Sequence, residues 1–198
     1  GLSAGTKGMI FGGTDILVNG ITIGFGKYQG SNTNLALGTN ALSNNISGLY
    51  NTSLGSNTLF NLTSGLSNIA MGEASLYNLT NGAQNIGIGR QALTATVSGA
   101  ENIGIGDFSL TSMGTASGNV AIGKSALYNL NTGNSNVAIG NSAFINVKGG
   151  NNTGVGTIVG YNLTTGTANT IVGYYTGLGI TTGGKNTIIG ANVSGLAT

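Results

Sequence analysis

A five-residue phrase that returns about every 17 residues constrains the fold of this chain more than any other feature. It consists of an asparagine, an apolar residue or threonine, usually a small residue, an aliphatic residue and a glycine, as in Asn85-Ile86-Gly87-Ile88-Gly89. The phrase opens at Asn34, Asn51, Asn68, Asn85, Asn102, Asn119, Asn136, Asn152, Asn169 and Asn186. Each step is 17 residues, except for a step of 16 between Asn136 and Asn152. Such a fixed period is typical of a solenoid, in which similar coils stack along one axis.

Each repeat predicts two short β-strands separated by glycine turns. In the first strand a small residue alternates with aliphatic ones, so that Gly87 faces the side opposite to Ile86 and Ile88. We expect the aliphatic pairs to form the chain's own core. A second strand is expected beyond the turn, where a small and a large apolar residue follow each other, as in Ala92-Leu93. Helices are not expected, because glycine costs about 1 kcal/mol at each site in a helix interior.

These patterns predict an all-β fold, a parallel β-solenoid of about ten 17-residue coils flattened into a β-roll. We assign the regular repeat array to residues 34–190 and a short tail to residues 191–198. Residues 1–33 are a glycine-rich lead-in that contains one degenerate coil, Gly20-Ile21-Thr22-Ile23-Gly24. The chain is expected to form one domain without a linker.

Composition argues against several classes of protein. Charged residues make up only 5% of the chain, which argues against disorder. The chain has no histidine and no cysteine, so metal sites built on nitrogen and sulfur ligands and histidine-dependent triads are excluded, and no cofactor is expected. The six Lys and Arg residues are scattered, which argues against nucleic acid. No run of about 18 apolar residues predicts membrane insertion. Because the chain begins with Gly1, we interpret it as a processed product or an excised segment.

The asparagines that open the repeats have two interpretations. In the functional one they form a polar recognition row. In the structural one each is a turn residue that tolerates left-handed backbone angles and stacks its amide on the next coil. We favour the structural interpretation.

Charged residues fall in one column of four consecutive coils. Glu73, Arg90, Asp107 and Lys124 each follow the first glycine of a coil and alternate in sign. Parallel stacking sets such neighbours about 4.8 Å apart. We therefore predict a charge ladder, worth a few tenths of a kcal/mol per exposed pair.

A single roll of this kind is short of apolar core. Each coil orders 17 residues but offers few aliphatic side chains to bury. We therefore predict a homotrimer in which the small residues of the first strand face the neighbouring chain. The predicted inter-chain contacts are Ala70, Gly87, Gly104, Ala121 and Ala138. A bulky residue at Gly87 is then expected to break the trimer before it breaks the coil.

The last repeats depart from the pattern. Ile171 and Ile188 stand where the small residue is expected, and Gly160 and Gly177 replace the large residue of the second strand. Either the trimer packing changes there or the roll tapers.

No group of residues predicts catalysis. The carboxylates are Asp15, Glu73, Glu101 and Asp107. Glu73 and Asp107 are predicted about 10 Å apart with Arg90 between them, which favours an ion ladder over a glycosidase pair. We therefore expect a protein that is not an enzyme. Four aromatic residues precede Asn-Leu at one coil position, where they either form an exposed row that holds sugars or, as we favour, shield a turn: Phe60, Tyr77, Tyr128 and Tyr161.

Two repeat phrases, Asn119-Val-Ala-Ile-Gly-Lys-Ser-Ala-Leu127 and Asn136-Val-Ala-Ile-Gly-Asn-Ser-Ala-Phe144, resemble the head repeats of YadA-like trimeric autotransporter adhesins. A closer likeness is to phage tail-fibre proteins that end in an intramolecular chaperone domain. Those carry runs similar to Val18-Asn-Gly-Ile-Thr-Ile-Gly24 and to Ala74-Ser-Leu-Tyr-Asn-Leu-Thr80. The resemblance covers about residues 18–190.

The resemblance implies a homotrimer of left-handed parallel β-rolls, located extracellularly, on a virion or at a cell surface. It transfers no ligand, although a host-surface glycan or protein is a candidate partner. We therefore expect a non-enzymatic structural fibre segment of a phage tail fibre or surface adhesin that contributes to host or surface attachment. The alternative is a subunit of a secreted or cell-surface filament that self-assembles end to end through exposed β edges.

Overall fold

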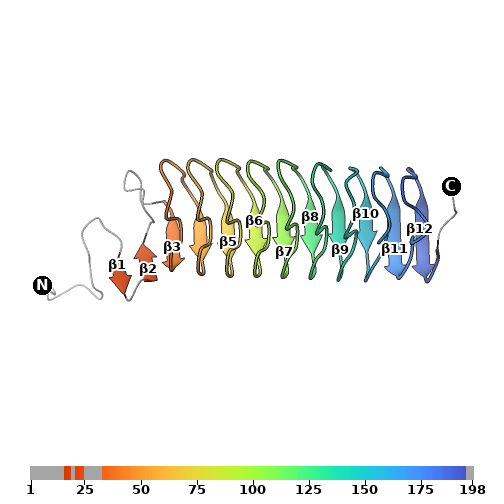
Figure 1. Ribbon diagram of the computed structural model, residues 1–198, viewed down its shortest axis with the longest axis horizontal. Helices are drawn as coiled ribbons and strands as arrows, with labels where there is room; N and C mark the ends of the chain where they lie inside the picture. Colours follow the sequence, from red (N-terminus) through yellow and green to blue (C-terminus); the bar gives the residue numbers. More distant parts are fainter. Residues whose placement is uncertain (1–15, 19–20, 25–32, 195–198) are drawn as a thin grey trace, which may run out of the picture.

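The computed structural model describes residues 16–18, 21–24 and 33–194, and within these ranges the chain is all-β. Ten parallel strands, β3 to β12, follow one another in a single sheet and form a parallel β-solenoid of about nine turns, with roughly 17 residues per turn (Figure 1). The strands are β1 (Ile16–Val18), β2 (Ile21–Gly24), β3 (Leu35–Gly38), β4 (Thr52–Leu54), β5 (Ile69–Met71), β6 (Ile86–Ile88), β7 (Ile103–Ile105), β8 (Val120–Ile122), β9 (Val137–Ile139), β10 (Thr153–Val155), β11 (Thr170–Tyr174) and β12 (Thr187–Ala191). A search of the described residues for a helix long and apolar enough to cross a bilayer finds none.

The first two strands do not form a coil of the solenoid. β1 and β2 make an antiparallel pair, and β2 pairs antiparallel with β3. Figure 1 shows β2 pointing opposite to both neighbours. The degenerate coil predicted at residues 20–24 is therefore wrong, because its strand runs in the reverse direction and covers the edge of β3. The rest of the predicted lead-in (1–15, 19–20 and 25–32) and residues 195–198 of the predicted tail lie outside the described residues.

Two glycine columns allow the coils to stack at this spacing. At Gly89, where φ is 128°, an added Cβ would lie 2.6 Å from the carbonyl carbon of Gly106 in the next coil. At Gly82, which turns the opposite corner, it would lie 2.3 Å from the carbonyl oxygen of Gly99. A side chain at either corner would collide with backbone that cannot move without unstacking the coils. The glycine period of the sequence is therefore a consequence of backbone-to-backbone contact at the corners.

Each regular coil contains one strand, and the predicted second strand is wrong. The segment that returns behind the strand, which we call the return segment, is a series of turns (residues 73–82 in the coil opened by Asn68). Ala74 and Leu76 adopt left-handed angles there, with φ of 55° and 52°. Such angles cost a non-glycine residue about 1–2 kcal/mol. Backbone hydrogen bonds between coils offset this cost, since the N–H of Leu76 donates to the carbonyl of Ala92 at 2.9 Å.

The small residues of the strands point into the chain's own core, and the aliphatic residues point outward. Ala70 is fully buried, whereas Ile139 is 38% exposed. A Cβ added to Gly87 would lie 2.5 Å from the hydroxyl of Ser75 and 3.2 Å from Cγ of Leu76, both in the return segment of the preceding coil. The expectation that the aliphatic pairs form the core is therefore wrong. The core comes instead from the large residues of the return segments: Leu42, Leu59, Leu62, Leu76, Leu79, Leu93, Leu110, Met113, Leu127, Leu130, Phe144, Val147, Val159 and Leu163.

The departures in the last repeats are volume compensation inside this core. Ile171 is fully buried at the strand position that is small elsewhere. A Cβ added to Gly177 would lie 2.7 Å from its Cδ1, and one added to Gly160 would lie 3.2 Å from the same atom. The converse exchange pairs Phe144 with Gly154, where a Cβ would lie 2.6 Å from the ring. Large and small residues thus exchange sides across a thin core that holds one large side chain per level.

Candidate functional site

The outward residues of β3 to β12 form one continuous surface, which we call the strand face. Its members are mostly aliphatic: Leu35, Leu37, Thr52, Leu54, Ile69, Met71, Ile86, Ile88, Ile103, Ile105, Val120, Ile122, Val137, Ile139, Thr153, Val155, Thr170, Val172, Thr187 and Ile189. Exposure reaches 56% at Leu35 and 71% at Ile189. At about 4.8 Å per strand the surface is roughly 43 Å long. Exposed apolar surfaces of this continuity are typical of interaction sites.

This surface replaces the inter-chain contacts predicted from the sequence. Ala70, Gly87, Gly104, Ala121 and Ala138 are all buried within their own chain. They cannot contact a neighbour, because the return segment of the same chain covers them. The residues that the sequence assigned to the core are the ones available to a partner.

The asparagine row is a buried hydrogen-bonded ladder. Asn85 is fully buried, and its side-chain amide donates to Oδ1 of Asn68 at 3.0 Å and to the carbonyl of Gly99 at 2.8 Å. Its own Oδ1 accepts the backbone N–H and the side-chain amide of Asn102, at 3.1 and 3.0 Å. The same backbone-to-amide contact joins every consecutive pair from Asn34 to Asn186. These amides stack as the structural interpretation proposes and are not available as a recognition row.

One detail of that interpretation is wrong. The left-handed residue at this corner is the one before the asparagine, as at Gln84 and Glu101 with φ of 59° and 60°. The asparagine side chains are conserved in position by their hydrogen bonds between coils, and their own backbone angles are not left-handed.

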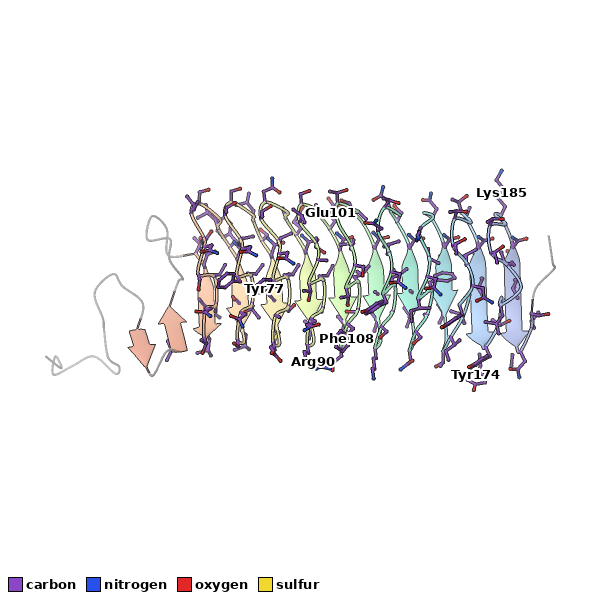
Figure 2. All side chains as sticks on the ribbon, viewed as in Figure 1. Tyr77, Arg90, Glu101, Phe108, Tyr174 and Lys185 are labelled. Atoms are coloured by element: carbon purple, nitrogen blue, oxygen red, sulfur yellow. The ribbon has the colours of Figure 1, made fainter. Side chains whose placement is uncertain are left out.

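The charge column forms one ion pair. Nε of Arg90 lies 3.8 Å from Oδ2 of Asp107, and the backbone N–H of Arg90 donates to Oδ1 of Asp107 at 3.0 Å. The guanidinium also lies 4.6 Å from the centre of the Phe108 ring, at the corner that Figure 2 shows beyond the strand ends. Among the described residues no other ion pair forms, so Glu73 and Lys124 do not extend the ladder. Both partners of the pair are about half exposed, which keeps its contribution small.

The aromatic row is interrupted. The rings of Phe60 and Tyr77 stack with centres 5.1 Å apart and planes within 3°. Tyr128 is half-buried, and Tyr161 is 42% exposed. The row therefore offers one stacked pair that protects its turn and, far along the solenoid, one ring that is open to a ligand.

A polar hollow lies on the return segments, on the wall opposite the strand face. It encloses about 460 Å³ and is lined by Ser112, Asn129, Asn131, Asn146, Lys148, Asn162 and Thr164. These residues occupy two positions of four successive coils, with the 16-residue coil opened by Asn136 in the middle. Sequence analysis did not predict this site. Its signal was the single irregular step of the repeat, which coincides with a lysine.

The chain matches no family model, no curated protein and no solved structure.

Proposed function

We propose that this chain is a non-enzymatic structural segment of a phage tail fibre or surface adhesin that contributes to attachment to a host or another surface. It acts as a homotrimer of left-handed β-rolls, outside the cell or on the virion. The observation that carries the proposal is the strand face, an apolar surface that runs the length of an otherwise complete solenoid.

The strand face has the composition of an interface between copies. The core of each coil is already filled by return-segment leucines, so the outward aliphatic residues are surplus to it. Covering side chains that are about 40% exposed contributes about 1 kcal/mol each, on the order of 10 kcal/mol over the whole face. This is comparable to the roughly 4–15 kcal/mol that association costs. Packing strand face to strand face therefore supports a stable oligomer, and three copies is the number that the resemblance of the repeats implies.

This packing leaves the return segments facing outward. They present asparagine, threonine and tyrosine side chains along the fibre, including the polar hollow. A fibre with an apolar interior and a polar exterior suits attachment through its sides. The short β1–β2 hairpin covers the edge of β3 and so opposes addition of a further strand there.

Binding to intact cells tests the attachment role. The full chain, fluorescently labelled, is incubated with a panel of Gram-negative and Gram-positive bacteria and counted by flow cytometry. Saturable binding to at least one strain, displaced by excess unlabelled chain, is expected. A folded oligomer that binds no strain above the level of a labelled control protein would contradict the attachment role.

A further inference from the structure

The polar hollow is created by the one short coil of the array. Asn119 donates its side-chain amide to the carbonyl of Gly133, which is 14 residues later, whereas Asn136 reaches the equivalent carbonyl of Gly149 after 13 residues. The missing residue is therefore the exposed one that precedes the corner glycine, represented by Thr132 in the coil before. Its loss removes a side chain beside Lys148 and opens the wall at that level.

The hollow contains polar groups without partners. Within the described part of the chain, the side chains of Ser112, Asn131 and Lys148 make no hydrogen bond or ion pair. Asn162 donates to the carbonyl of Leu178 at 2.8 Å, and its Oδ1 accepts nothing within the same described residues. These groups converge on one volume from three sides. They offer amide donors and acceptors, a hydroxyl and one positive charge.

A second hollow at the same coil positions provides an internal comparison. It is lined by Asn44, Ile46, Asn61, Thr63, Asn78, Thr80, Ala95 and Val97. Here the amides pair with each other, as Asn44 donates to Asn61 at 3.3 Å and Asn61 to Asn78 at 3.1 Å. Its lining carries no charge and includes more apolar surface. The free polar groups are thus a property of the short-coil hollow and not of the repeat in general.

The chemistry of the hollow selects among ligands. The backbone groups of the wall are used between coils, as where Lys148 donates its N–H to the carbonyl of Thr164 at 2.7 Å, so an extended peptide cannot add there as a strand. One lysine is too little positive charge for a nucleic acid. Neutral amides and hydroxyls in a shallow groove suit a ligand rich in hydroxyl groups, and the unopposed lysine suits one carboxylate.

An exposed ring extends the site. A neighbouring hollow of about 370 Å³ is lined by Ile158, Tyr161, Asn162, Tyr175 and Leu178, and it shares Asn162 with the first. The Tyr161 ring can cover the apolar face of a sugar while its hydroxyl stays in water. We propose that the two hollows together bind an acidic oligosaccharide, whose carboxylate pairs with Lys148 and whose hydroxyls pair with Asn131 and Asn162. This inference rests on the proposed attachment role and names the ligand class for it.

Titration calorimetry on the full chain tests the inference. The probes are short oligomers of galacturonic acid and of sialic acid, a neutral galactose oligomer, and poly-L-glutamate as a carboxylated polymer without sugar rings. One of the acidic oligosaccharides is expected to bind, with the neutral oligomer and poly-L-glutamate at least tenfold weaker. Lys148→Gln is expected to weaken binding about tenfold to a hundredfold.

The matched control is Lys124→Gln, which removes the same charge from an exposed lysine that does not line the hollow and should leave affinity within twofold. Lys148 is itself exposed, and circular dichroism is expected to show unchanged structure in both variants. The inference is overturned if no acidic oligosaccharide binds, if poly-L-glutamate binds equally well, or if the two lysine variants behave alike. Attachment to cells without oligosaccharide binding would sink this inference and leave the proposed function standing, whereas a chain that binds the oligosaccharide but no cell would contradict the proposed function alone.

Discussion

Removing one rung of the asparagine ladder should cost far more than its single side chain suggests. In Asn85→Ala, the carbonyl of Gly99 and the backbone N–H of Asn102 lose their hydrogen-bond partner. Both groups belong to buried residues. A buried polar group without a partner costs about 1–3 kcal/mol, so the substitution should destabilise the fold by roughly 2–6 kcal/mol. Water cannot easily compensate, because the ladder continues on both sides of the gap.

The matched control is Asn78→Ala, seven residues earlier in the same coil. Asn78 is half-buried and accepts one amide hydrogen bond from Asn61 at 3.1 Å, which water can replace. Its loss should cost less than about 1 kcal/mol. Urea unfolding followed by circular dichroism, at one fixed protein concentration, gives both values. If Asn85→Ala were as stable as Asn78→Ala to within 1 kcal/mol, the ladder would not be a main source of stability.

Three smaller predictions concern single coils. Ser75 and Ser109 occupy the same coil position, but only Ser75 donates its hydroxyl to a backbone carbonyl, at 2.9 Å, while the buried hydroxyl of Ser109 has no partner; thermal melts should show Ser75→Ala destabilised by about 1 kcal/mol and Ser109→Ala unchanged or more stable, and the reverse order would contradict this. Ile171→Ala should cost about 2–5 kcal/mol through the cavity it leaves, and adding Gly177→Leu should recover part of that loss, so a urea double-mutant cycle without coupling would refute the volume exchange. Arg90→Gln should change stability by less than about 1 kcal/mol because its ion pair is half exposed, and a larger loss in the same urea assay would show that the pair matters.

The repeat and the solenoid could be predicted from the sequence because a strict period leaves few architectures. The direction of the strand residues could not. Alternation shows that Gly87 and Ile88 face opposite sides, but both sides of this strand are packed or apolar, so it does not show which side is the interior. Leu76 in the return segment decides the matter, since it fills the thin core and leaves room only for a small residue. The opposed exchanges at Gly154 and Ile171 carried that information.

The return segment was mispredicted for a different physical reason. Leucine and alanine have no intrinsic preference for left-handed angles, so nothing at Leu76 or Ala74 signals them. The angles arise from stacking, which makes hydrogen bonds between coils available only to that conformation. The ion pair of Arg90 and Asp107 followed from the period, but its limit to one pair depends on side-chain reach that the period does not encode.

The central claim is that copies of this chain pack through the strand face, and sedimentation velocity tests it most directly. The unsubstituted chain should sediment at three times its 19.5 kDa mass. Ile88→Lys combined with Ile105→Lys places charges on the strand face and should give a monomer with an unchanged circular dichroism spectrum. Gly87→Val should instead disrupt the coil, because its Cβ would collide with Ser75 at 2.5 Å. A folded monomer of the unsubstituted chain, or a trimer that survives both lysines, would contradict the claim.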